Sequence, residues 1–272
     1  MPELPEVEHL ARDLAPRILG LTIRDVRCHF PAVVGEDPDC FAEAVRGRRI
    51  MRLHRHGKYL FLMLDGDVVL ALHLRMTGQF LLVPRAEPAD KHTHLELLLS
   101  DRKRKIVFRD VRKFGRIKLL DGNVVQFIEE KKLGADALQI SAGDLQQSFQ
   151  ATSRSIKAAL LDQRIVAGLG NIYTDEILFR ERISPLRKAR SLNLEQIASL
   201  RRTIRAVLRS AIRRRGTTIS DYVDAGGRIG SFQSSLLVYS RAGLPCPRCG
   251  TAIVKSRVAG RGTYSCPGCQ PT

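Results

Sequence analysis

The chain has 272 residues, enough for two domains with separate cores. Its 44% hydrophobic and 27% charged residues are ordinary for a folded protein and exclude a disordered chain. The 45 Lys and Arg residues against 28 Asp and Glu residues give a net charge of +17, which predicts a polyanionic partner, nucleic acid before an anionic membrane surface. No apolar run approaches the ~20 residues of a membrane-spanning helix, and no signal peptide is visible. We therefore expect a soluble, cytoplasmic protein.

The N-terminus reads Met-Pro-Glu-Leu-Pro-Glu-Val-Glu. Removal of the initiator methionine would leave Pro2 with a free secondary amine, and an α-amino group titrates near pH ~8, so part of it is neutral at physiological pH. Such an amine can attack an aldehyde-like carbon and form an iminium. Glu3, Glu6 and Glu8 offer carboxyl groups for proton transfer beside it. The alternative is an acidic, proline-stiffened tail that frays in solvent.

The segment 9–19 has apolar residues at helical spacing and is followed by Gly20, so it predicts a helix. A series of short apolar or alternating runs then predicts strands, separated by turn-forming pairs such as Asp65-Gly66. These runs are 50–53, 59–64, 68–74, 79–83, 95–99, 105–109 and 115–120. Many short strands at this spacing indicate a β-sandwich or barrel.

After about residue 131 the periodicity becomes helical, over 144–149, 155–162, 171–182 and 193–214. The last of these segments has one apolar stripe with an arginine series beside it, which is either a solvated face or a contact surface. A glycine-rich segment follows, and then a short predicted strand over 236–239. We expect a β-rich N-terminal domain, a hinge near 130–140 and a helical domain.

Four of the six cysteines form two Cys-x-x-Cys pairs near the C-terminus. Two such pairs at this separation indicate a four-cysteine zinc site, and no ligand position is open, so the expected ion is a single structural Zn²⁺. A pair of disulfides is the alternative, which a reducing cytosol disfavours. Cys28 and Cys40 are expected to be buried thiols. The proposed ligands are Cys246, Cys249, Cys266 and Cys269.

Taken together, the terminal Pro-Glu-Leu-Pro-Glu-Val-Glu, the β-rich and helical halves and the final four cysteines resemble bacterial formamidopyrimidine-DNA glycosylases. Further segments match in order along the chain: 56–59 (HGKY), 73–78 (HLRMTG), 110–115 (DVRKFG), 168–173 (GLGNIY) and 261–264 (RGTY). The resemblance implies an α+β protein. Its parts are a catalytic β-sandwich domain with flanking helices at 1–132, a hinge at 133–140, a helix-two-turn-helix domain at 141–235 and a β-hairpin zinc finger at 236–270.

The resemblance also implies an activity: removal of oxidised purines from double-stranded DNA, followed by β,δ-elimination at the abasic site. Pro2 would be the nucleophile, Glu3 the proton shuttle, Lys58 a proton donor and phosphate contact, and Arg261 an aid to δ-elimination. Glu6 would help to structure the site. We expect a monomer that acts on the bacterial nucleoid and needs no cofactor beyond zinc.

Base excision inside a stacked duplex requires the nucleotide to be flipped out. By resemblance, Met76, Arg112 and Phe114 form the wedge that fills the gap, although Met76 and Phe114 taken alone would more often be core residues. The loop 217–235 would cover the flipped base, or would be only a linker. The remaining DNA contacts implied are His92, Arg112, Arg154, Lys157 and Asn171.

Two alternatives stay open. The first is an endonuclease VIII-like glycosylase, which shares the Pro-Glu start but acts on oxidised pyrimidines. The second is a non-catalytic zinc protein that uses its positive charge only to bind damaged DNA. The chain also departs from the commonest family pattern in its hinge, at Arg154 and in the covering loop, and none of these positions belongs to the implied catalytic set.

Overall fold

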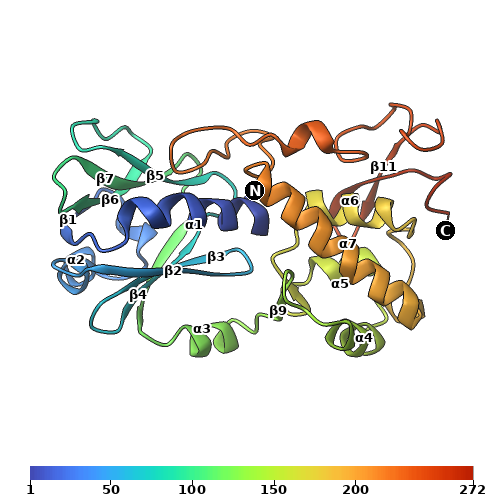
Figure 1. Cartoon of the computed structure of the whole chain (residues 1–272), viewed down its shortest axis with the longest axis horizontal. Coiled ribbons are helices and arrows are strands. Elements are labelled where there is room, and N and C mark those ends of the chain that lie inside the picture. The colour runs from blue at the N-terminus through green and yellow to red at the C-terminus, as the bar shows by residue number, and fades with distance from the viewer. Residues whose placement is uncertain (272) are drawn as a thin grey trace. The chain divides into compact units, whose positions relative to one another are not determined.

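The computed structural model of the chain describes residues 1–271, and its helices and strands are labelled in Figure 1. The chain divides into two compact units. The first comprises Met1–Lys131 and Ile212–Gln233, and the second comprises Lys132–Ala211 and the segment that begins at Ser234. Residues 212–233 therefore pack with the N-terminal unit, although they follow the helical segment in the chain.

The first unit contains two four-stranded antiparallel sheets. One has the order β1-β6-β7-β5 and the other the order β2-β3-β4-β8. The sequence predicted every strand except β1, in which three charged residues interrupt the apolar pattern. The bounds are β1 (Ile23–Cys28), β2 (Ile50–His56), β3 (Tyr59–Leu64), β4 (Val68–His73), β5 (Gly78–Pro84), β6 (Thr93–Leu99), β7 (Arg104–Asp110) and β8 (Arg116–Asp121).

The two sheets share one hydrophobic core, which confirms the predicted β-sandwich. Alternate residues of both sheets enter it, among them Leu60 and Leu62 of β3 and Leu97 and Leu95 of β6. The helices α1 (Leu4–Ile18) and α2 (Pro38–Val45) and the short 3₁₀ turn η1 (Pro31–Val33) add to this core. A smaller apolar cluster lies on the other face of β3 and β4, under α3 (Val124–Glu130).

Helix α1 begins five residues earlier than predicted, because its first turn is capped. Glu3 is the N-cap residue, and its side chain and that of Glu6 form a reciprocal capping box. Pro5 stands in the first turn, where a missing N–H costs no helical hydrogen bond. The acidic N-terminal segment is therefore an ordered first turn and not a frayed tail.

The second unit is mostly helical, as the sequence predicted. Helices α5 and α6 are joined by the Gly168–Gly170 turn, in which the Gln163 side chain accepts a hydrogen bond from Gly168 N (3.0 Å) and donates to Leu169 O (2.8 Å). The elements are β9 (Ala135–Asp136), α4 (Ala142–Gln150), α5 (Ile156–Leu161), β10 (Val166–Ala167), α6 (Asn171–Arg180), η2 (Ala189–Ser191), α7 (Leu194–Arg213), η3 (Phe232–Ser235), β11 (Val254–Val258) and β12 (Arg261–Ser265). The last two residues of α7 and the first two of η3 belong to the first unit.

Two local expectations were wrong. The segment 236–239 is not a strand, because the backbone N–H groups of Leu237, Val238 and Tyr239 all donate to the buried carboxylate of Glu176 (2.8, 2.9 and 3.1 Å). Cys40 is exposed at the start of α2 and is not a buried thiol.

The longest helix of the described residues, α7, has a regular series of arginines on its surface. Neither it nor any other helix within residues 1–271 combines the length and the apolar character that a membrane crossing requires.

Candidate active site and nucleic-acid interface

The N-terminal turn lies in the interior of the first unit. Pro2, Glu3 and Glu6 are all buried, and Glu3 and Glu6 are only 2% and 1% exposed. One oxygen of the Glu6 carboxylate accepts from Glu3 N (2.8 Å), and the other accepts from Thr217 N (2.7 Å). The same carboxylate therefore holds both the backbone next to Pro2 and the first residue of the 217–235 loop.

That loop is fixed to the first unit at several further points. The Tyr222 hydroxyl donates to the backbone oxygen of Glu6 (3.1 Å), and the Gln79 side chain donates to the backbone oxygen of Asp221 (2.6 Å). Two large apolar side chains of the loop stay exposed, Ile219 at 53% and Ile229 at 62%. The loop is therefore anchored to the first unit, while these two apolar side chains remain on its surface.

Lys58 lies in the tight turn between β2 and β3, where Gly57 takes a left-handed conformation (φ 56°). Its side chain is buried, at 7% exposure. Arg55 connects this turn to α1, since its Nε donates to the Glu8 carboxylate (2.6 Å) and its guanidinium also donates to Gly57 O (3.0 Å). Burial raises the pKa of Glu8, but the adjacent Arg55 and Arg12 outweigh it and hold that pKa below its usual value. Glu8 therefore remains a charged anchor for the turn that carries Lys58.

His73 is a candidate residue that the sequence analysis did not single out. It pairs with Tyr59, the residue after Lys58, in the β3–β4 register. Burial, Arg75 and Lys58 together lower the pKa of His73 to about 3. Its Nδ1 accepts a hydrogen bond from Arg75 N (3.0 Å), so the imidazole is neutral and its protonated nitrogen is Nε2. The signal available in the sequence was a histidine at the end of an apolar strand, which is too common to assign.

The expected wedge residues lie on two turns of the first unit. Met76 is 39% exposed and Phe114 is 48% exposed, so neither is a core residue. The Arg112 guanidinium lies 4.7 Å from the centre of the Phe114 ring. His92 is half-buried before β6, and its backbone N–H donates to the Asp90 carboxylate (2.9 Å).

In the second unit, Asn171 and Lys157 converge on the hairpin that carries Arg261. The Asn171 side chain donates to Gly262 O (2.8 Å), and Lys157 Nζ donates to the same oxygen (3.2 Å). Lys157 also forms an ion pair with Asp175 (2.6 Å), and both side chains are 0% exposed. The sequence placed Lys157 among the phosphate contacts, whereas in the structure its ammonium group is enclosed and holds the backbone next to Arg261.

The other two basic candidates of this unit are on its surface. Arg261 is exposed at the first position of β12. Arg154 is also exposed, and its guanidinium donates to the Asp162 carboxylate (2.8 Å), which Arg164 shares. The direct contacts from Arg164 and Arg154 lower the pKa of Asp162 to about 2, so this cluster is an ionised one.

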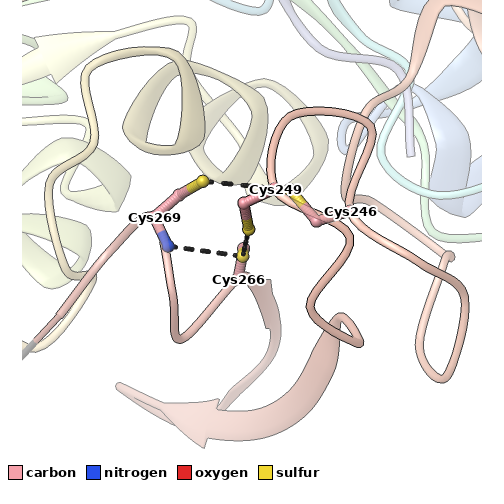
Figure 2. A group of neighbouring side chains, drawn as sticks. All are labelled: Cys246, Cys249, Cys266 and Cys269. Carbon is pink, nitrogen blue, oxygen red and sulfur yellow. Dashed lines mark hydrogen bonds between the residues drawn. The ribbon is translucent and has the colours of Figure 1, made fainter.

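The four cysteines of the two Cys-x-x-Cys pairs converge on one point, as Figure 2 shows. All four Sγ atoms lie within 4.8 Å of one another, with Cys246 and Cys269 at 3.9 Å and Cys249 and Cys266 at 3.4 Å. A tetrahedral zinc ion with Zn–S bonds of ~2.3 Å requires sulfur atoms roughly 3.8 Å apart. The donor set and its spacing fit zinc.

Family profiles cover most of the chain. Residues 1–117 match the formamidopyrimidine-DNA glycosylase N-terminal domain, 133–223 match the formamidopyrimidine-DNA glycosylase H2TH domain, and 243–272 match a zinc finger found in FPG and IleRS. The chain is 43% identical to the formamidopyrimidine-DNA glycosylase of Bacillus cereus, over 100% of this chain and 99% of that protein. It is 44% identical to the enzyme of Herpetosiphon aurantiacus, over 99% and 100%.

The chain belongs to the formamidopyrimidine-DNA glycosylase family.

Solved structures of this family agree. A Lactococcus lactis formamidopyrimidine-DNA glycosylase variant in complex with DNA containing Fapy-dG matches with a TM-score of 0.94 at 35% identity, covering 100% of both chains. The Lactococcus lactis enzyme with DNA containing an abasic site matches with a TM-score of 0.93 at 36% identity, covering 99% of this chain and 100% of that one. The α+β fold, with its H2TH domain and four-cysteine zinc finger, is confirmed, and the protein is a DNA-repair glycosylase.

In this glycosylase the candidate residues form two groups. Pro2, Glu3, Glu6, Lys58 and the wedge belong to the first unit. Asn171, Lys157, Arg154, Arg261 and the zinc cysteines belong to the second. The structure adds His73, Asp110 and Asp175, three buried or half-buried polar residues. Asp110 and Asp175 each also bond to a residue that is distant in the sequence, Thr77 and Tyr264 respectively.

Proposed function

We propose that this glycosylase removes oxidised purines, chiefly 8-oxoguanine and formamidopyrimidines, from duplex DNA and then cleaves the strand as an abasic-site lyase. The observation that carries the proposal is the buried N-terminal turn. Pro2 and Glu3 are enclosed and are held through Glu6 beneath the 217–235 loop. An enclosed amine beside carboxyl groups is suited to covalent chemistry from which water is excluded.

In the proposed mechanism Met1 is removed, and the Pro2 nitrogen attacks C1′ of the damaged nucleotide. The bond from C1′ to the base breaks, the base leaves with a proton, and the opened sugar remains bound to Pro2 as an iminium. The iminium acidifies the C2′ hydrogen. Loss of that proton expels the 3′ phosphate, and a second elimination expels the 5′ phosphate.

Glu3 and Lys58 move protons in this scheme. Glu3 gives a proton to the sugar ring oxygen when the ring opens and later recovers it. Lys58 donates a proton during elimination and contacts a phosphate. Its position next to the neutral His73 supports this assignment, because the low dielectric that depresses the His73 pKa also strengthens a charge interaction between an ammonium and a phosphate.

The DNA contacts follow from exposure and charge. We assign Met76, Arg112 and Phe114 to the gap left by the flipped nucleotide, with the Arg112 guanidinium toward the orphaned base. His92, Arg154 and Arg261 are assigned to phosphates, and so is Asn171 at the N-terminus of α6. Lys157 acts on the phosphate contact indirectly, by fixing Gly262 beside Arg261.

One zinc ion, bound by Cys246, Cys249, Cys266 and Cys269, would supply a rigid cross-link for the C-terminal hairpin and no step of the reaction. We propose that the enzyme works as a monomer in the cytoplasm, where bacterial DNA lies.

The test is strand cleavage on matched duplexes that carry 8-oxoguanine opposite cytosine or thymine glycol opposite adenine. We expect faster release of 8-oxoguanine, with both ends of the gap phosphorylated. A Lactococcus lactis relative has been solved with DNA containing an oxidised pyrimidine, so some release of the glycol is compatible with the proposal. A clear preference for thymine glycol would favour the endonuclease VIII-like alternative, and tight binding with no cleavage would favour a non-catalytic binder.

A further inference from the structure

The two wedge turns have the same backbone feature. Arg75, which precedes Met76, has φ 54°, and Lys113, which precedes Phe114, has φ 59°. Non-glycine residues rarely adopt this left-handed conformation, so each turn needs other contacts to hold it. In both turns the next residue presents an exposed apolar side chain.

A single buried carboxylate provides such contacts to both turns. Asp110 is 0% exposed at the end of β7. From its own turn it accepts hydrogen bonds from Arg112 N (3.1 Å) and Gly115 N (2.7 Å). From the other turn it accepts a hydrogen bond from the Thr77 hydroxyl. The Thr77 oxygen in addition accepts from Arg112 N (3.2 Å), so the two turns are joined twice.

The surroundings of Asp110 are equally constrained. Its backbone oxygen accepts from His94 Nε2 (2.7 Å), and Gly78 lies directly opposite it in the β5–β7 register. Gly115 lies very close to Phe108 and Asp110. A Cβ at position 115 would lie 2.4 Å from Phe108 Cζ and 3.1 Å from the Asp110 carboxylate. The close packing fixes Asp110, and Asp110 in turn fixes both turns.

We propose that Asp110 is a positioning residue that joins the two wedge turns, so that Met76, Arg112 and Phe114 enter the DNA stack as one preformed unit. This inference rests on the proposed function of the wedge. Opening a stacked base pair is costly, and a wedge that is already ordered avoids the added entropy of ordering it at that moment. Both links between the turns run through the Thr77 hydroxyl, and we expect neither to be needed once the base has been lost.

The test compares single-turnover rates on two duplexes of the same sequence, one with 8-oxoguanine opposite cytosine and one with a preformed abasic site. Thr77→Val removes the hydroxyl and keeps the shape of the side chain. We expect the rate on the paired lesion to fall roughly tenfold, about the effect of one buried hydrogen bond, and the rate on the abasic site to change less than about twofold. Thr77→Ser restores the hydroxyl and should restore the rate.

Thr203→Val is the matched control, because Thr203 in α7 also donates to a carboxylate, that of Glu181 (2.5 Å), outside the proposed site. It should leave both rates unchanged. Thr77→Ala serves as a second variant should the valine variant not fold. An independent readout is NMR of methyl-labelled methionine, in which Thr77→Val should change the Met76 signal and leave the signal of Met51, exposed on β2, as it is.

Equal loss on both substrates, or no loss on either, overturns the inference while the proposed function stands. A wild-type protein that is inactive on both duplexes overturns the proposed function itself.

Discussion

Replacement of Glu6 by glutamine should separate the N-terminal turn from the loop that begins at Thr217. The Glu6 carboxylate accepts from Glu3 N (2.8 Å) and Thr217 N (2.7 Å), and it is 1% exposed. Glutamine can retain only one of these bonds, because its amide NH₂ would face the other backbone N–H. Loss of a buried acceptor costs about 1–3 kcal/mol. For a unit of this size, ~2 kcal/mol lowers the Tm by about 4–8 °C.

The assay is thermal unfolding together with hydrogen exchange at the Thr217 amide and single-turnover cleavage of an 8-oxoguanine duplex. We expect a lower Tm, faster exchange at Thr217 and slower cleavage for Glu6→Gln. Glu43→Gln is the control, since Glu43 is exposed on α2 and should change none of the three quantities. A variant with wild-type Tm and wild-type protection at Thr217 would refute the reasoning that this carboxylate joins the two segments.

Three further predictions follow from the charges and the cysteines. Cys249→Ser should release zinc, measured with a chromogenic chelator, and weaken DNA binding. The control Cys40→Ser should do neither. Full DNA affinity of the metal-free protein would contradict a role of the zinc finger in DNA binding. DNA affinity should fall by orders of magnitude between ~50 and ~200 mM salt if several phosphates are neutralised, and a flat response would contradict a backbone-binding surface. The pKa of about 3 for His73 lies below the ~6.5 of an unfolded histidine. At pH values between these two, the unfolded state therefore binds a proton that the folded state does not. The free energy of unfolding should therefore fall as the pH falls through this window, with His73 contributing at most ~1.4 kcal/mol per pH unit. His73→Gln should make the free energy of unfolding less dependent on pH in this window. An unchanged pH dependence would exclude His73 as its source.

The parts of the fold that repeat a pattern were predictable from sequence. The strands of the sandwich and the helices of the second unit follow periods of about 2 and 3.6 residues. Strand β1 was missed because its charges break the alternation, and the start of α1 was missed because it depends on capping by Glu3 and Glu6. The segment 236–239 was misassigned because the partner of its backbone N–H groups, the Glu176 carboxylate, lies 61 to 63 residues earlier in the chain.

The resemblance names candidate site residues, but their long-range contacts could not be predicted from the sequence. Lys157 has the residue type of a phosphate contact, but Asp175 encloses it. The function of Asp110 depends on Thr77, which is 33 positions away, and that of Glu6 depends on Thr217, which is 211 positions away. A hydrogen bond between such distant residues leaves no periodic signal in the sequence of either segment.

The role of Pro2 as the nucleophile is tested by borohydride trapping on a duplex that carries one 8-oxoguanine opposite cytosine, with the adduct mapped by mass spectrometry. We expect a covalent adduct on Pro2 of a chain that lacks Met1. No adduct is expected for a chain whose Pro2 nitrogen is kept in a peptide bond by an N-terminal residue that is not removed. An adduct on a lysine, or trapping in a protein that keeps its methionine, would contradict Pro2 as the nucleophile.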